Sequence, residues 1–252
     1  MTVKFTIAKE ALRSAIATMD INEYCFITAQ NNALYFTTLN EKNTIGAHVC
    51  IDEGIRWYQT QSSFFVGINI SHLDFWLRTI EAKTLYVSIS NDFFECESED
   101  AKHKFKMRVA EDYKYVAPKF HNAITRRHTY DIEVSLNLLS RYLSAMEVFV
   151  DKSEIIPDDG GISLSTGERC GISYYAKQHD VVFRIDGKGN TADKFSGTCY
   201  NTEFLNQAVH VLPYWLGDSV IVCFGKDVPI TFSVVGCGGT FSVSVTPMIS
   251  DV

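Results

Sequence analysis

The sequence has no run of about 18 apolar residues, the length that a bilayer-spanning helix requires. It has no Cys-x-x-Cys pair, so the spacing typical of zinc and redox motifs is missing. Its first residues enter an alternating strand pattern, without the basic region and apolar core of a targeting segment. We therefore expect a protein that stays in the compartment where it is made and has no membrane partner.

A basic excess is missing too, because 23 Lys and Arg residues stand against 30 Asp and Glu residues, for a formal net charge of -7. Binding nucleic acid over the whole surface requires a basic footprint, so this charge argues against it but leaves a local basic lining open. The seven cysteines are scattered through strand-like runs, and we expect most of them to be buried, reduced thiols.

Motifs for metal binding and catalysis are also missing. The seven histidines show no metal-ligand spacing. Two glycine-containing segments, 187–189 and 236–239, lack the ending of a phosphate loop and are interpreted as hairpin turns. We predict no cofactor, no metal site and no enzymatic activity. A β-rich enzyme with duplicated domains and dispersed catalytic residues is the alternative from another class.

What the sequence does contain is an internal repeat. Residues 5–16 run from a strand pattern into a helix pattern, and residues 132–143 do the same. A second pair relates residues 67–87 to residues 197–222. The aligned apolar residues of the first pair are Leu12 with Leu139, Ile16 with Leu143, and Met19 with Met146. A length of 252 residues allows one large domain or two, and the repeat favours two.

Each half combines two helices with many strands. Helical period occurs in four segments, at about 9–19, 71–81, 136–146 and 202–212, and alternation of period two dominates elsewhere. This order predicts an α+β fold with helices packed on antiparallel sheets. Ser71 and Thr202 are expected to cap their helices. Turns at 31–32 and 91–92 are expected to use positive φ.

Between the halves lies a connector. We predict an N-terminal domain over residues 1–112, a connector over 113–128 and a C-terminal domain over 129–252. In the connector the alternation fails, Pro118 disfavours helix at Ala117, and polar residues accumulate. Its apolar side chains leave two interpretations open, a passive linker or a docking surface.

Several short motifs, taken in order, resemble those of sliding clamps of the proliferating cell nuclear antigen type. Glu53-Gly54-Ile55 with Tyr58, followed by Gly67-Ile68-Asn69-Ile70-Ser71, is similar to the family's run into its second helix. Asp227-Val228-Pro229-Ile230 and Val245-Thr246-Pro247-Met248-Ile249 are similar to its two C-terminal signatures, Asp-x-Pro-Leu and Leu-Ala-Pro-Lys-Ile. The resemblance covers essentially the whole chain.

The resemblance implies the DNA clamp fold, in which three two-domain subunits form a ring with sheets outside and helices lining a hole for duplex DNA. The implied function is that of a processivity factor that encircles double-stranded DNA independently of sequence. The implied partners are DNA polymerase, a clamp loader, flap endonuclease and DNA ligase, which dock through short peptides. The implied location is the nucleus in a eukaryote and the cytoplasm in an archaeon. A checkpoint-clamp subunit or one member of a heterotrimeric clamp is the alternative within this fold.

The resemblance also assigns residues to three surfaces. The DNA-facing residues are Lys9, Arg13, Arg78, Lys83, Arg141 and His210. The partner-peptide pocket comprises Leu39, Asn43, Ile45, Tyr115, Val116, Phe120, Ile124, Val228, Pro229, Thr246 and Pro247. The subunit interface comprises Lys104, Lys106, Arg108, Ile172, Tyr174 and Ala176. Because Glu10, Asp74 and Glu203 lie on the same helices, the expected basic lining is weak.

A strand pattern of alternating cations stands out in the first half. Lys102, Lys104, Lys106 and Arg108 fall on one face of the expected strand, and apolar residues with His103 fall on the other. Three roles stay open for these cations: subunit pairing, contact with DNA near the inner rim of a ring, and edge-strand lysines that discourage aggregation.

Overall fold

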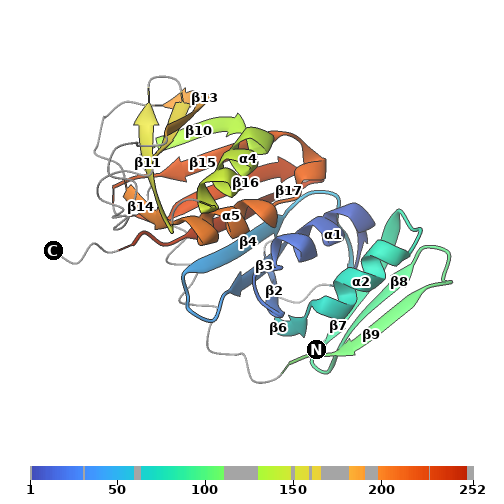
Figure 1. Ribbon diagram of the computed structural model, residues 1–252. Coiled ribbons are helices and arrows are strands. Elements are labelled where there is room, and N and C mark those ends of the chain that lie inside the picture. Colours follow the sequence, from blue (N-terminus) through green and yellow to red (C-terminus); the bar gives the residue numbers. More distant parts are fainter. Residues whose placement is uncertain are drawn as a thin grey trace. The chain divides into compact units, whose positions relative to one another are not determined.

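The computed structural model describes residues 2–30, 32–59, 64–110, 130–148, 151–158, 161–165, 182–190, 198–226 and 228–248. These residues form four α-helices and antiparallel strands, which confirms the predicted α+β class (Figure 1). The chain divides into two compact units. Unit 1 is Met1–His121 with Val235–Ser242, and unit 2 is Asn122–Val234 with Val243–Val252.

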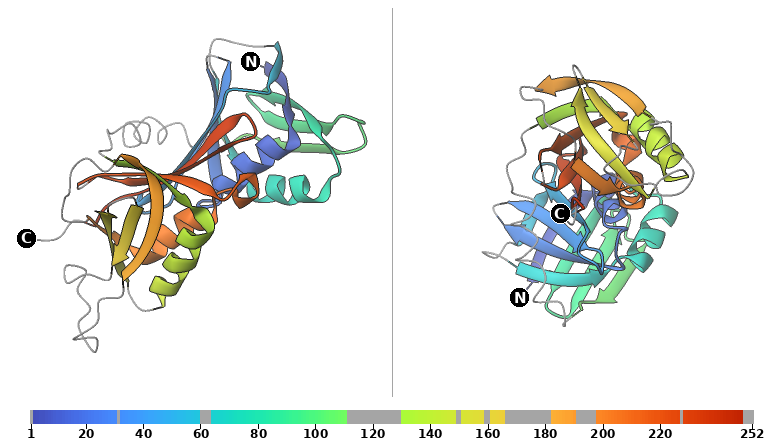
Figure 2. Two further views of the ribbon diagram at one scale, coloured as in Figure 1. Left: turned by 90° about the horizontal axis from the view of Figure 1, so that it is seen from above. Right: turned by 60° about the vertical axis from the view of Figure 1, so that its left-hand side comes forward.

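Unit 1 contains two antiparallel sheets and two helices, α1 (Lys9–Thr18) and α2 (Ser71–Thr79). The five-stranded sheet has the order β5 (Arg56–Gln59), β1 (Thr2–Ala8), β7 (Thr84–Ser90), β8 (Phe93–Ser98), β9 (Lys104–Arg108). The second set of strands has the order β4 (Ile45–Ile51), β3 (Ala33–Leu39), β2 (Tyr24–Gln30), β6 (Phe64–Asn69). The two helices lie side by side (Figure 2).

Unit 2 repeats this plan with α4 (Leu136–Glu147) and α5 (Thr202–His210), which also lie side by side. A 3-10 turn (Tyr214–Leu216) follows α5. The last strand among the described residues is β17 (Gly239–Val245), of which Gly239–Ser242 belongs to unit 1 and Val243–Val245 to unit 2. The other strands have the order β14 (Thr198–Asn201), β11 (Lys152–Asp158), β12 (Gly161–Ser165), β13 (Val182–Asn190), β10 (Tyr130–Ser135), β15 (Ser219–Phe224), β16 (Ile230–Gly236).

The structure confirms the internal repeat in both pairing and packing. In unit 1, Ala8 at the end of β1 pairs with Thr84 at the start of β7. In unit 2, Ser135 at the end of β10 pairs with Ser219 at the start of β15, so the register is the same. The three apolar pairs aligned by the repeat are all at most 1% exposed: Leu12 with Leu139, Ile16 with Leu143, and Met19 with Met146. Each helix therefore anchors its unit through the same apolar stripe.

Two predicted helix caps are wrong by one or two residues. The side chain of Asn201 caps α5 by accepting a hydrogen bond from the Phe204 N–H at 2.9 Å. Thr202 is instead fully buried, with its hydroxyl 2.7 Å from that of Ser153. Ser71 is the first residue of α2, and its N–H donates to the Asn69 side chain at 3.1 Å. Thr202 is the first residue of α5 and its hydroxyl contacts Ser153, so the residue before it provides the cap.

Turn geometry follows the prediction in part. Asn32 has φ 64, as expected, and Cys237 and Gly238 have φ 48 and φ 72 between β16 and β17. Asn91 and Asp92 do not adopt positive φ. Their turn is closed by the Ser90 hydroxyl, which accepts a hydrogen bond from the Phe93 N–H at 3.0 Å. Serine at the first position of a turn makes this bond without any left-handed residue.

The segment 187–189 is a strand, which corrects the predicted hairpin turn. Gly187 and Gly189 pair with Val134 and Ile132 of β10. A Cβ on Gly189 would lie 2.0 Å from the Asp131 carbonyl oxygen, and one on Gly187 would lie 2.6 Å from Ile132 Cγ2. These glycines therefore permit close approach of two strands.

The cysteines described by the structure are free thiols. Burial raises the pKa of Cys25 and of Cys96 above the ordinary thiol value. Burial, with a hydrogen bond to Asp131, raises the pKa of Cys223 to about 12. Cys50, Cys199 and Cys223 are half-buried, and Cys237 is exposed in the turn before β17. The expectation that most cysteines are buried is therefore wrong for the described residues.

Candidate nucleic-acid interface

The predicted DNA-facing residues of unit 1 are largely engaged within the unit. The Lys9 ammonium donates to the Ile80 carbonyl oxygen at 2.6 Å, just past the end of α2, where a cation is favoured by the helix dipole. The Lys9 N–H donates to the Lys83 carbonyl oxygen at 2.8 Å. Lys9 thus joins the start of α1 to the end of α2. Its ammonium group already donates a hydrogen bond there, so it is less available to contact a phosphate.

Both arginines of these helices form ion pairs with acidic residues one turn away. Arg13 lies 3.6 Å from Glu10 on α1, and Arg78 lies 2.8 Å from Asp74 on α2. These pairs are partly exposed, and exposed pairs contribute only about 0.2–1 kcal/mol, so a phosphate can compete for either guanidinium. The paired carboxylates nevertheless reduce the net positive charge of this helical face.

A second acidic residue, Asp20, lies near the Asp74–Arg78 pair. Partial burial raises the pKa of the Asp20 carboxyl, the Asp74 carboxylate raises it further, and Arg78 opposes them. One oxygen of Asp74 is buried without a hydrogen-bond partner. Unit 1 therefore places two carboxylates near Arg78, one on α2 and one in the turn after α1, which is unfavourable for phosphate contact.

The helices of unit 2 have a different electrostatic character. Arg141 of α4 is exposed, and no carboxylate within the described part of the chain pairs with it. His210 ends α5, and its Nδ1 lies 3.0 Å from the Asn206 carbonyl oxygen. An Nδ1–H that donates to this carbonyl leaves Nε2 directed to solvent. Lys83, the remaining predicted cation, is exposed after α2 in unit 1.

The cationic strand of unit 1 faces away from the helices. Lys104, Lys106 and Arg108 are exposed on β9, whereas Phe105 and Met107 alternate with them and are half-buried. The Phe105 ring lies 5.5 Å from that of Trp76 on α2, so α2 covers the apolar side of β9. The β9 cations therefore lie on the side of the strand opposite α2, and their three possible roles stay predictions.

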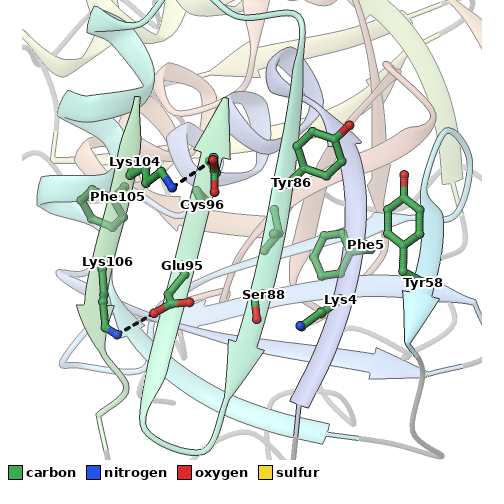
Figure 3. Close-up of a pocket in the computed structure, with 12 residues that line it drawn as sticks. Lys4, Phe5, Tyr58, Tyr86, Ser88, Glu95, Cys96, Lys104, Phe105 and Lys106 are labelled. Carbon is green, nitrogen blue, oxygen red and sulfur yellow. Dashed lines mark ion pairs between the residues drawn. The ribbon is translucent and has the colours of Figure 1, made fainter. Parts of the chain in front are cut away.

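Carboxylates on the neighbouring strand pair with two of these lysines (Figure 3). Lys104 lies 3.1 Å from Glu97, and Lys106 lies 2.6 Å from Glu95. Lys102 precedes β9 and pairs with Asp100 at 3.4 Å, so the prediction that it shares the strand is wrong. The Ser98 hydroxyl and the Lys102 backbone N–H hold the pKa of Asp100 at about 2.

The part of the predicted peptide pocket that lies in unit 1 is a loop shaped by an asparagine. Asn40 accepts hydrogen bonds from the Thr44 N–H at 2.8 Å and the Ile45 N–H at 3.1 Å. Asn43 is exposed with φ 55, Leu39 is half-buried, and Ile45 is fully buried. The role of Asn40 in ordering this loop was not predicted from the sequence, although an asparagine that precedes a short polar loop is the signal for such a turn.

The residues of the predicted pocket that lie in unit 2 are held by β14. The Tyr200 hydroxyl donates to the Val228 carbonyl oxygen at 2.9 Å, beside buried Pro229. The Met248 N–H donates to the Cys199 carbonyl oxygen at 2.9 Å, which orders the segment with Thr246 and Pro247. The other predicted residues, Tyr115, Val116, Phe120, Ile124, Ile172, Tyr174 and Ala176, lie outside the described residues.

The described residues contain neither a membrane-spanning helix nor a cluster of metal ligands. No helix among them is both long and apolar enough to cross a bilayer. No group of three or more His, Cys, Asp or Glu side chains among them is placed to hold a metal ion.

Comparison with known proteins gives a structural match. No protein-family model and no curated protein matches the sequence. A chain of the solved structure described as the C-terminal region of FEN-1 bound to A. fulgidus PCNA matches with a TM-score of 0.75 and 12% sequence identity. The match covers 99% of this chain and 100% of that chain. At this identity the similarity shows the fold, which is that of a PCNA-like clamp.

Proposed function

We propose that this chain is a DNA sliding clamp, a non-enzymatic processivity factor that assembles as a ring of three copies around duplex DNA. The observation that carries the proposal is the match to a clamp fold along 99% of the chain. The repeated units support it, because each places a pair of helices side by side on its sheet strands, and three such chains supply six helix pairs to a ring.

The proposed mechanism is topological tethering. A closed ring holds DNA by encirclement, so it needs no base contacts and only weak phosphate contacts, which permits sliding. The engaged cations of unit 1 are compatible with this mechanism, since Lys9, Arg13 and Arg78 all contact groups of their own unit. A clamp loader that uses ATP would open the ring.

The proposed partners bind through short peptides. The matched structure is described as containing the C-terminal region of FEN-1 bound to PCNA, and we extend this to a flap endonuclease peptide on the present chain. Leu39 and the loop ordered by Asn40, together with the segments at Val228–Pro229 and Thr246–Pro247, are the surfaces proposed for it. DNA polymerase and DNA ligase are proposed to use the same surfaces.

The oligomeric mass tests the ring. Light scattering at micromolar concentration should give about three times the chain mass of 28.4 kDa. After treatment with a clamp loader, the protein should stay on circular DNA and slide off linear DNA. Equal loss from both would contradict encirclement.

One member of a heterotrimeric clamp is the second candidate. It is favoured by the acidic surroundings of Arg13 and Arg78, because a subunit that shares a ring with more basic partners needs less positive charge of its own. A persistent monomer in light scattering, with a ring formed only after a partner chain is added, would support this candidate.

A further inference from the structure

The face of the five-stranded sheet opposite α2 carries an open groove of about 700 Å³ (Figure 3). We call it the sheet groove and define it by Lys4, Tyr58, Tyr86, Ser88, Lys104 and Lys106. These residues come from β1, β5, β7 and β9, and the carboxylates Glu95 and Glu97 of β8 also line the groove. All of these residues belong to unit 1. The volume falls in the range of ligand sites and is far too small for a duplex.

Two tyrosines form an exposed aromatic platform in the sheet groove. Tyr58 is 53% exposed and Tyr86 is 48% exposed, with ring centroids 6.4 Å apart and ring planes at 28°. The neighbouring Trp57 instead packs on buried Phe5 at 5.0 Å, so the fold of β5 directs Tyr58 outward. The sheet core does not require either tyrosine, and paired aromatic rings at a surface favour a planar ligand.

Unpaired cations flank this platform. The Arg56 guanidinium lies 5.5 Å from the Tyr58 ring centroid, and Lys4 lines the groove beside it. Within the described part of the chain, neither Lys4 nor Arg56 forms an ion pair with a carboxylate. Lys104 and Lys106 are occupied by Glu97 and Glu95. The tyrosine end of the groove is therefore positive on a chain whose net charge is -7.

We propose that the sheet groove binds single-stranded DNA. Exposed aromatic rings on which bases stack, next to cations that contact phosphates, are what sequence-tolerant binding of single strands requires. In this arrangement a base stacks on Tyr86 or Tyr58, and phosphates contact Lys4 and Arg56. Both the aromatic rings and the cations at this end of the groove then have a partner in the ligand. Duplex DNA hides the faces of its bases and leaves the tyrosines without a partner. An acidic peptide matches the cations and leaves the stacking platform unused.

This proposal goes beyond the clamp function and is independent of the ring. The helical face of the unit would meet duplex DNA, whereas the sheet groove lies on the opposite side of the five-stranded sheet. A single strand held there is bound by unit 1 of one chain. The residues proposed to contact the strand, Lys4, Arg56, Tyr58 and Tyr86, lie on β1, β5 and β7, whereas the predicted subunit-interface residues Lys104 and Lys106 lie on β9. The expected result is therefore the same for a monomer and a trimer.

Fluorescence anisotropy with a labelled 12-nucleotide oligo-dT tests the groove on the full chain. Tyr86→Leu is expected to weaken binding about tenfold, because one stacked base is lost. Lys4→Gln is expected to reduce the slope of log K against log salt by about 0.7, the value for one phosphate contact on a single strand. Both residues are exposed, and thermal melting checks that each variant folds.

Matched controls separate stacking from general loss of binding. Tyr86→Phe keeps the ring and is expected to bind within about twofold of the parent. Tyr214→Leu removes a tyrosine of unit 2 that is 71% exposed, and it is expected to leave binding unchanged. An oligonucleotide of the same length without bases is expected to bind about tenfold more weakly.

Four results would overturn the proposal. The first is the absence of saturable binding by the parent chain. The second is a loss with Tyr214→Leu that equals the loss with Tyr86→Leu. The third is an abasic strand that binds as tightly as oligo-dT, which would show that the groove contacts phosphates and that no base stacks on the tyrosines. The fourth is an oligo-glutamate peptide of equal length that binds as tightly as oligo-dT and loses affinity in Tyr86→Leu, which would assign the groove to acidic peptides.

Discussion

The helix pair of unit 1 and the helix pair of unit 2 share a buried stripe and differ at their surfaces. Leu12 and Leu139 occupy the same position and are at most 1% exposed. On the surface, Arg13 and Arg78 of unit 1 contact Glu10 and Asp74, whereas Arg141 of unit 2 has no such partner within the described residues. Duplication has thus preserved packing more strictly than charge, because a core residue contacts many neighbours and a surface residue few.

The largest expected effect tests the shared core. Leu139→Ala on α4 and Leu12→Ala on α1 should each lower the free energy of unfolding by about 3 kcal/mol, because each opens a cavity in a closely packed site. Urea denaturation monitored by circular dichroism measures the change. Leu138→Ala, at a position that is 40% exposed on the same helix, is the matched control and should change stability by less than about 0.5 kcal/mol. Equal losses of unfolding free energy for Leu138→Ala and Leu139→Ala would contradict the assignment of Leu139 to the buried apolar stripe.

The second prediction concerns how the second helix of each unit begins. Asn201→Ala removes the side-chain cap of α5 and should lower the free energy of unfolding by about 1 kcal/mol. Ser71→Ala should have little effect, because the Ser71 side chain caps nothing in α2. Thermal melting of the two variants compares them. A larger loss of stability for Ser71→Ala than for Asn201→Ala would contradict this result and support the sequence-based prediction that Ser71 caps α2.

These two comparisons show what the sequence could and could not predict. The apolar period of α1 and α4 predicted the buried stripe, because burial depends on spacing that is visible in one dimension. The cap of α5 was missed because Asn201 and Thr202 are both good caps, and only burial of Thr202 against Ser153 distinguishes them. Local preference is a weak signal wherever two adjacent residues satisfy it equally.

The candidate site shows the same limit for charge. Cations on the helices were identified from sequence, but their ion pairs depend on side-chain geometry, as Arg78 with Asp74 shows. The strand alternation around Lys104 was predicted correctly, because it follows from period two. Which face of that strand α2 covers required the contact between Trp76 and Phe105. Tertiary contacts of this kind lie outside what periodicity can show.

The third prediction tests the charge difference directly through duplex binding. Arg141→Gln should reduce the slope of log K against log salt by about 0.9, the value for one phosphate contact on duplex DNA. Asp74→Asn should increase the slope, because it frees Arg78 for phosphate. Anisotropy of a labelled duplex over a salt series measures both.

A carboxylate on the sheet of unit 2 provides the control for this pair of variants. Asp186→Asn changes a residue of β13 that pairs with Arg184 at 3.4 Å, and it should leave the slope unchanged. An unchanged slope for Arg141→Gln as well would show that Arg141 does not face DNA. Equal increases for Asp74→Asn and Asp186→Asn would show a general charge effect.

The smallest expected effect concerns the acidic cluster of unit 1. In the folded protein the pKa of Asp20 lies above its ordinary value of 3.8, through partial burial and the Asp74 carboxylate. Protonation of Asp20 therefore favours folding, so its contribution is present below pH 3.8 and is lost as the pH rises through the folded-state pKa. Asp20→Asn should raise the melting temperature slightly at pH 7, and the difference should shrink as the pH falls toward 3.8.

Melting curves of Asp20→Asn between pH 3.5 and pH 7, at about 0.1 M salt to limit screening, measure this difference. Asp92→Asn, at an exposed turn of the same unit, is the matched control and should change the melting temperature little at either end of the range. A gain for Asp20→Asn that persists undiminished at low pH would contradict an electrostatic cause and point to packing. A gain that disappears in the Asp74→Asn background would assign it to repulsion between the two carboxylates, because the cost of burying a charged Asp20 remains in that background and would preserve part of the gain.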